Sequence, residues 1–163
     1  GAGTGNILRE VWTGISGKAV GNLTGLDAFP GSPDQRELLP AVEGPRGSKD
    51  YGQRISGYIY PPVTGQYRFW IASDDQSQLW LSTDASPANK QLIAGVTDWT
   101  PSREFDKSAS QSSPAVTLRS GQRYYIEVLH KQADQKDNVS VAWQPPGGGR
   151  SVIDGQYLSP ARE

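Results

Sequence analysis

Residues 65–72 read GQYRFWIA and carry the alternation of side chains that decides the fold class. Tyr67, Phe69 and Ile71 fall on one face of an extended chain, because successive side chains of a β-strand point to opposite faces. The residues between them fall on the other face. One side of such a strand packs on an apolar core, so the pattern predicts a half-buried or wholly buried β-strand.

The same alternation recurs over residues 124–131 and 139–143, whereas no segment sustains helical periodicity for three turns. Pro and Gly punctuate the chain at 61–65 and 145–149, where Pro fixes φ and Gly permits positive φ. Short strands separated by turns predict an all-β fold, an antiparallel β-sandwich. The expected strands are Ile7–Trp12, Gln53–Tyr60, Gly65–Ala72, Ser77–Ser82, Ala115–Leu118, Arg123–His130, Val139–Gln144 and Tyr157–Leu158.

Two segments, residues 21–50 and 83–114, lack strong strand signals. We expect them to form long loops at one end of the sandwich, with a short helical turn within residues 86–94. Loops of this length in a compact domain are often functional. Trp12 and Trp143 are expected in the core, since each lies in a predicted strand.

Composition and length predict a single globular domain over residues 1–163, with 35% hydrophobic and 20% charged residues. The chain has 16 Lys and Arg against 17 Asp and Glu, with no basic run, so we expect no nucleic-acid partner. No apolar stretch approaches the roughly 20 residues that cross a bilayer, which argues against membrane insertion. The absence of Met suggests a piece excised from a larger chain with covalent neighbours.

Enzyme motifs are missing: no G-x-S-x-G, H-E-x-x-H, P-loop or strand-linked G-x-G-x-x-G occurs. The chain has no Cys and a single His, which excludes a cysteine nucleophile and a multi-histidine metal site. His130 shares a strand face with Ile126 and Val128, so we interpret it as a buried, hydrogen-bonded histidine rather than a general base. These observations indicate a protein that is not an enzyme.

Acidic residues occur at two predicted strand connections. Asp74 and Asp75 lie between the strands 65–72 and 77–82, and Asp134, Asp137 and Asn138 lie between the last long strands. Calcium takes six to eight oxygen ligands and needs neither His nor Cys. Asp and Asn are also ordinary turn residues, because their side chains bond nearby backbone groups. From spacing alone, a calcium site and solvated turns both remain open.

Several stretches resemble the protective-antigen-type (PA-fourteen) domain family over nearly the whole chain. They are YGQRISGYI at 51–59, PPVTGQYRFWIASDD at 61–75, LWLS at 79–82 and DNVSVAW at 137–143. The resemblance implies a β-sandwich of the kind found in bacterial adhesins and yeast flocculins. It also implies carbohydrate binding as the usual role.

In lectin members of that family, an Asp-Asp pair joined by a cis peptide holds a calcium ion, and vicinal sugar hydroxyls complete its coordination. The resemblance places this pair at Asp74 and Asp75. It places a second ligand loop at 134–138, with the carboxylate of Asp137, help from Asp134 or Asn138, and a backbone carbonyl near Lys136. The residues expected to contact sugar are Asp74, Asp75, Gln76, Trp99 and Asp137.

The expected function is therefore that of a calcium-dependent carbohydrate-binding module, a lectin or adhesin, in an extracellular or cell-surface protein. Its partners would be glycans or polysaccharides on cell surfaces. The alternative is a structural or interaction domain of a secreted surface protein, in which an ion only fixes the loops. Calcium binding without sugar binding would favour that alternative.

Overall fold

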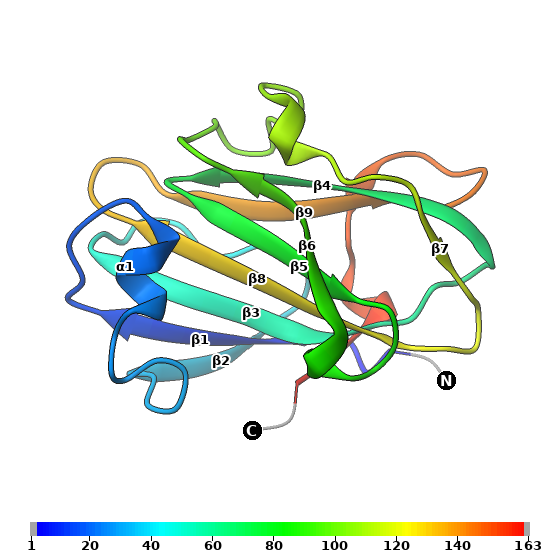
Figure 1. Ribbon diagram of the computed structural model, residues 1–163, viewed down its shortest axis with the longest axis horizontal. Helices are drawn as coiled ribbons and strands as arrows, with labels where there is room; N and C mark the ends of the chain where they lie inside the picture. Colours follow the sequence, from blue (N-terminus) through cyan, green and yellow to red (C-terminus); the bar gives the residue numbers. More distant parts are fainter. Residues whose placement is uncertain (1–2, 162–163) are drawn as a thin grey trace.

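Two antiparallel β-sheets packed face to face form the domain in the computed structural model, which describes residues 3–161 (Figure 1). This confirms the predicted antiparallel β-sandwich. The larger sheet has the order β2-β1-β3-β8-β5-β6, with β11 also paired to β3. Its strands are β1 (Ile7–Thr13), β2 (Gln35–Leu39), β3 (Tyr51–Ile59), β5 (Ser77–Ser82), β6 (Lys90–Val96), β8 (Tyr124–Gln132) and β11 (Leu158–Pro160).

The smaller sheet has the order β10-β9-β4-β7. Its strands are β4 (Gly65–Asp74), β7 (Val116–Leu118), β9 (Asn138–Gln144) and β10 (Ser151–Val152). Within the described part of the chain, helical structure is limited to α1 (Val20–Thr24) and the 3-10 turns η1 (Pro87–Asn89), η2 (Ala109–Gln111) and η3 (Gly155–Tyr157). No helix among residues 3–161 has the length and apolar character needed to cross a membrane.

The expectation that residues 21–50 and 83–114 are loops is wrong where β2 and β6 lie. Both are edge strands of the larger sheet, and most of their side chains are exposed or half-buried. An edge strand with solvated faces lacks the apolar alternation that reveals a strand in sequence. The predicted strand Tyr157–Leu158 begins one residue later, because η3 occupies Tyr157.

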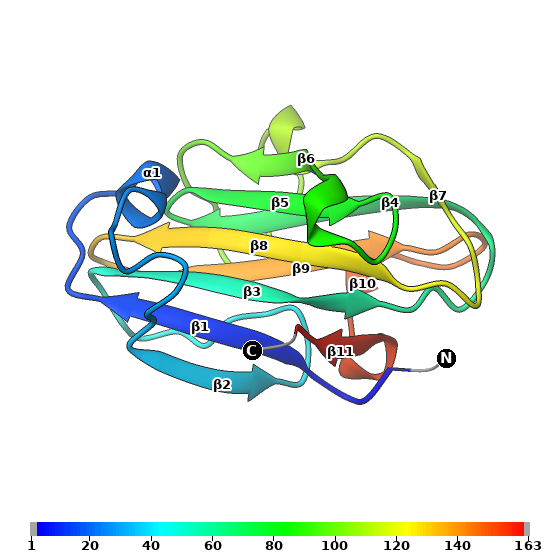
Figure 2. The same ribbon diagram turned by 60° about the horizontal axis from the view of Figure 1, so that its bottom comes forward.

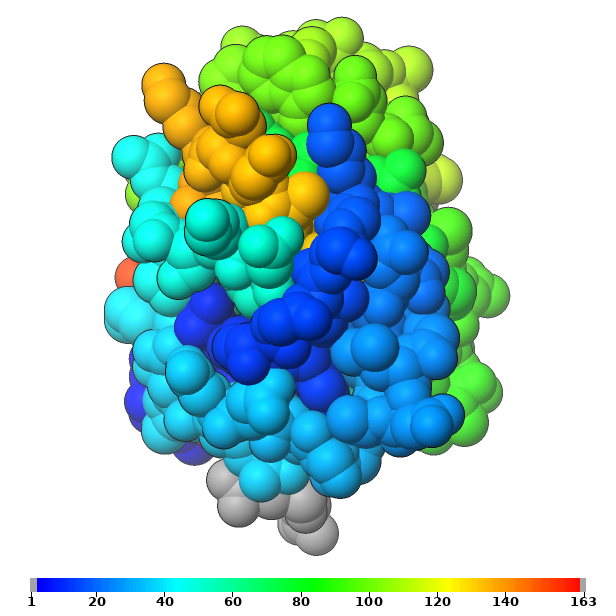
Figure 3. All heavy atoms as spheres, turned by 90° about the vertical axis from the view of Figure 1, so that its left-hand side faces the viewer, coloured from blue at the N-terminus to red at the C-terminus, as the bar shows by residue number. Residues whose placement is uncertain are grey.

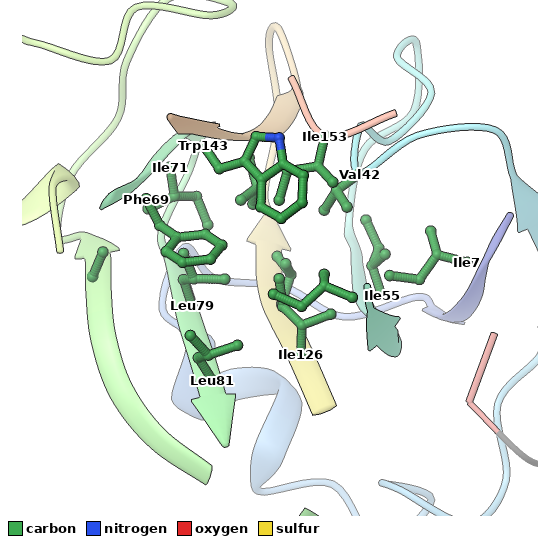
Figure 4. Close-up of a cluster of buried hydrophobic side chains, with 14 of the residues drawn as sticks. Ile7, Val42, Ile55, Phe69, Ile71, Leu79, Leu81, Ile126, Trp143 and Ile153 are labelled. Atoms are coloured by element: carbon green, nitrogen blue, oxygen red, sulfur yellow. The ribbon is translucent and has the colours of Figure 1, made fainter. Parts of the chain in front are cut away.

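The core lies between the two sheets, as the labelled side chains in Figure 4 show. Trp143 of β9 is 2% exposed and packs against Tyr67, with ring centroids 5.3 Å apart. Trp12 is buried in a second cluster with Ile15 and Leu23, on the outer face of the larger sheet. Both tryptophans are therefore buried as predicted, although in separate clusters.

Lys131 of β8 is fully buried beneath the loop between β1 and α1. Its ammonium group donates to the carbonyls of Ile15 at 2.8 Å, Gly17 at 2.7 Å and Gln132 at 2.8 Å. Burial lowers the pKa of Lys131. Because the loop's carbonyls have this donor in place of water, Lys131 fastens the loop to the sheet.

The first and last strands meet at one end of the sandwich, where β11 lies beside the start of β1 (Figure 2). Thr4 N donates to Leu158 O at 2.7 Å, and Leu158 pairs with Ile59 at the end of β3. The other end of β3 begins at Tyr51, opposite Gln132 at the end of β8. The acidic connections lie at this second end.

Candidate binding site

The connection from β4 to β5 carries Asp74 and Asp75 from the smaller sheet to the larger one. The peptide bond between the two residues is cis. Asp75 N donates to Lys131 O at 3.1 Å, and Ser73 Oγ donates to Asp75 O at 2.7 Å. The acidic pair is thus fixed by hydrogen bonds to β8 and to its own strand.

The two carboxyl groups of this pair lie against each other. Asp75 is 6% exposed, and its Oδ2 accepts a hydrogen bond from Ala133 N at 3.0 Å. Burial and the neighbouring Asp75 carboxyl raise the pKa of Asp74 to about 7. A cation between the carboxyl groups would favour the ionised form of both.

Asp137 and Asn138 come to the same place from the connection between β8 and β9. The Asp137 carboxylate accepts from Gly47 N at 2.7 Å, Ser48 N at 3.3 Å and the Tyr51 hydroxyl at 2.7 Å. Burial and the Asp137 carboxylate together raise the pKa of Tyr51, which keeps its hydroxyl protonated as a donor.

Asn138 is the register partner of Asp74 across β4 and β9. Its Nδ2 donates to Thr100 O at 3.0 Å, whereas its Oδ1 is buried without a hydrogen-bond partner among residues 3–161. Buried oxygens normally have a partner. The unpaired Oδ1 therefore marks a place where an acceptor is free for a ligand.

A cavity of about 650 Å³ opens between these segments. Figure 3 views this end of the molecule, where the segments around residues 15–25, 45–50, 100–110 and 133–138 come together. Among the residues lining the cavity are Arg46, Asp74, Trp99, Lys136, Asp137 and Asn138. The volume falls in the usual range of small-molecule sites, about 300 to 1,000 Å³.

Trp99 is the exposed aromatic side chain of this cavity, with 45% of its surface accessible. Its backbone forms an isolated bridge with Asp74. The Lys107 ammonium lies 3.7 Å from the centre of the Trp99 ring and donates to Trp99 O at 2.7 Å. This cation–π contact steadies the indole beside the acidic pair.

Five of the eight residues expected at the site line this cavity, and three do not. Asp74, Trp99, Lys136, Asp137 and Asn138 line it, and Asp75 adjoins them through Asp74. Asp134 is exposed outside the lining, and the Gln76 amide is committed to Thr97 O and Val20 N. Metal binding by Asp134 and sugar contact by Gln76 stay predictions.

The carbonyl of Lys136, the expected backbone ligand, accepts a hydrogen bond from Gln132 Nε2 at 3.0 Å. The described residues contain no group of three or more His, Cys, Asp and Glu arranged to hold a metal ion. An ion at this site would therefore need amide and carbonyl oxygens beside the carboxylates, which is a donor set that calcium accepts.

Sequence reasoning missed several polar residues that line the cavity. Arg46, Thr100 and Ser102 line it from two irregular segments in which no periodic pattern predicts an orientation. Tyr51 lies two residues before the predicted strand Gln53–Tyr60 and begins the observed strand β3, at the end that carries the acidic connections. His130 is buried and hydrogen-bonded at both ring nitrogens, which confirms its interpretation.

The fold and the cavity define a β-sandwich module whose connecting loops form a pocket at one end. The chain belongs to the PA14 domain family, whose sequence model matches residues 45–156. This shows the resemblance noted in the sequence to be correct.

Curated relatives contain this module as a small part of much larger proteins. N-acetyl-beta-glucosaminyl-glycoprotein 4-beta-N-acetylgalactosaminyltransferase 1 of Mus musculus is 40% identical over 162 residues, which cover 95% of this chain and 16% of that protein. Fibrocystin of Canis lupus familiaris is 32% identical over 142 residues, covering 79% of this chain and 3% of that protein.

Solved structures share the fold at low sequence identity. The PA14 sugar-binding domain from an RTX adhesin has a TM-score of 0.69 at 13% identity, covering 96% of this chain and 98% of that chain. The A domain of epithelial adhesin 9 from Candida glabrata, in complex with Galb1-4GlcNAc, has a TM-score of 0.67 at 12% identity, covering 94% of this chain and 89% of that chain.

Proposed function

We propose that this domain is a non-catalytic carbohydrate-binding module of an extracellular or cell-surface protein, and that it binds glycans through a calcium ion at the acidic pair. The observation that carries the proposal is the convergence of Asp74, Asp137 and Asn138 at one cavity, with Asp75 next to Asp74 and with Asn138 Oδ1 unpaired among the described residues. The sugar complex named for one structural neighbour and the sugar-binding domain named for another support it.

The residues present fit calcium. Carboxylate and amide oxygens are hard donors of the kind that calcium prefers, and Asn138 Oδ1 has no competing partner within the described chain. The three hydrogen bonds to Asp137 leave capacity on its two oxygens, because a carboxylate has about four lone-pair sites. Extracellular calcium sites of modest affinity, with Kd of about 10⁻⁴ to 10⁻³ M, remain filled outside cells.

When bound, calcium supplies open coordination positions that adjacent hydroxyls of a sugar can fill. The residues of the chain then orient the ring: Trp99 offers an aromatic face, while Arg46 and Lys136 offer hydrogen-bond donors. A second cavity of about 370 Å³ shares Arg46, Ser102 and Asn138 with the first. The two cavities therefore adjoin, which favours an oligosaccharide that contacts both over a single sugar.

The direct test is calorimetry on protein stripped of metal. We expect calcium to bind, and sugars with adjacent hydroxyls to give heat with calcium but none with a chelator. Oligosaccharides should bind more tightly than the corresponding monosaccharides. Calcium binding without any sugar response would support the structural or interaction role instead, and the absence of calcium binding would contradict the proposal.

Replacing Trp99 with Ala should lower sugar affinity about tenfold, since a stacked aromatic side chain contributes on the order of 1 kcal/mol or more to binding. Calcium affinity should stay unchanged, because Trp99 contributes no side-chain oxygen. Titration of each ligand separately measures both effects. Leu92→Ala is the matched control, because Leu92 is also exposed but does not line this cavity. Equal sugar affinity in Trp99→Ala and the parent would exclude stacking at this residue.

A further inference from the structure

The only histidine of the sequence lies directly behind the acidic pair. His130 of β8 is fully buried on the core side of the larger sheet. Its Nε2 is 2.7 Å from the backbone carbonyl oxygen of Asp74, and its Nδ1 is 2.8 Å from Gln53 Nε2. The imidazole therefore joins Gln53, near the start of β3, to the backbone of the acidic pair.

The hydrogen bonds of this group have one consistent direction. Arg9 can only donate, and its Nε donates to Gln53 Oε1. The Gln53 amide nitrogen must then face the imidazole and donate to Nδ1. The ring proton is left on Nε2, where it donates to Asp74 O. At the far end, Arg9 also donates to Glu37 Oε2 of β2 at 2.5 Å.

These polar side chains face the core, whereas the next core-facing residues along the same strands are apolar. Ile55 and Val128 lie next along the same faces of β3 and β8. Burying an arginine, an amide and an imidazole costs desolvation free energy, and apolar residues of similar size would often be as stable. Stability alone therefore does not account for a polar layer at the site end of an otherwise apolar core.

We propose that Arg9, Gln53 and His130 are positioning residues, a hydrogen-bonded series that runs from Glu37 to the carbonyl of Asp74 and holds the acidic pair in its ion-binding arrangement. By fixing the Asp74 carbonyl, the series fixes the backbone from which both carboxylates project. The calcium readouts below rest on the proposed function, whereas the imidazole readout does not.

Nuclear magnetic resonance of the imidazole nitrogens tests which ring nitrogen carries the proton, and hence the direction of the hydrogen bonds. The chain has a single histidine, so the imidazole signals can belong only to His130. We expect the neutral ring to carry its proton on Nε2, and its nitrogen signals to shift when calcium is added. A proton on Nδ1 would overturn the proposal. Signals unaffected by saturating calcium would do so as well. Failure of the parent protein to bind calcium at all would instead count against the proposed function and leave the tautomer result intact.

Substitutions test the effect on the ion. Removing residues that orient metal ligands typically weakens metal binding by about tenfold to a hundredfold. We expect Gln53→Met and His130→Leu to weaken calcium binding within this range, because both abolish ordered donation to Asp74 O. His130→Gln should retain most of the affinity, since its amide N–H can replace the ring donor. This rescue distinguishes positioning from packing.

Tyr67→Phe serves as the control for general loss of stability. It deletes a buried hydroxyl that bonds to Val63 O at 2.5 Å, near the opposite end of β4. We expect a lower unfolding temperature with unchanged calcium affinity. Calcium affinities in His130→Leu and His130→Gln that equal each other would overturn the proposal. If Gln53→Met does not fold, the two His130 variants and the tautomer measurement still decide the question.

Discussion

Asp74→Asn is expected to weaken calcium binding about a hundredfold or more, while the calcium-free variant unfolds at the same temperature as the parent or a higher one. The loss follows from removal of a charged ligand, because ligand charge largely sets calcium affinity. Stability is retained because the ionised form of Asp74 is unfavourable in the calcium-free protein, where burial and the Asp75 carboxyl raise the pKa of Asp74. Calorimetry and thermal unfolding, each with and without calcium, measure both effects.

The parent should gain stability as calcium is added, since a ligand that binds only the folded state stabilises it by mass action. The Asp74→Asn variant should show no such gain. Asp27→Asn is the matched control, because Asp27 is exposed in another part of the chain. A calcium-dependent rise in unfolding temperature that persists in Asp74→Asn would contradict an ion at the acidic pair.

Lys131→Met is expected to lower the free energy of unfolding by about 3 kcal/mol, because three carbonyls lose their donor inside the protein. Met has a similar length and fills the space, so packing changes little. Denaturant unfolding at equilibrium gives the difference. The loop from Ile15 to Gly17 should also exchange its amide hydrogens faster, since Lys131 fastens it.

Lys136→Met provides the comparison, because Lys136 is exposed and has no ion pair with a described residue. Its substitution should change the free energy of unfolding by no more than about 0.5 kcal/mol. Similar losses in the two variants would show that the three carbonyl contacts of Lys131 contribute little to stability.

The central strands of the sandwich could be predicted because their environment imposes a periodic pattern. Tyr67, Phe69 and Ile71 alternate since one face of β4 packs on the core. The same reasoning failed for β2 and β6, which are specified by backbone pairing with β1 and β5 rather than by apolar side chains. Edge strands depend on the neighbour they pair with, and one sequence does not display that neighbour.

The candidate site, like the fold, could be predicted from the sequence only in part. Asp74 and Asp137 could be predicted because they are acidic residues at strand connections, and the family resemblance implies that they belong to one site. Arg46 and Thr100 reach the cavity through irregular segments, where the path of the chain follows from tertiary contacts. The role of Gln53 could not be predicted, because an inward glutamine in a strand acquires meaning only from the Arg9 and His130 atoms beside it.

The hydrogen bond between Thr4 and Leu158 has a mechanical consequence. A module whose first and last strands touch can be inserted into an exposed loop of a host protein without separating the ends of that loop. Tension applied along such a host protein would be borne by only a few residues of the module, those at the junction of β1 and β11. The pocket, at the opposite end of the sandwich, would then lie outside the path of the force and keep its shape under load.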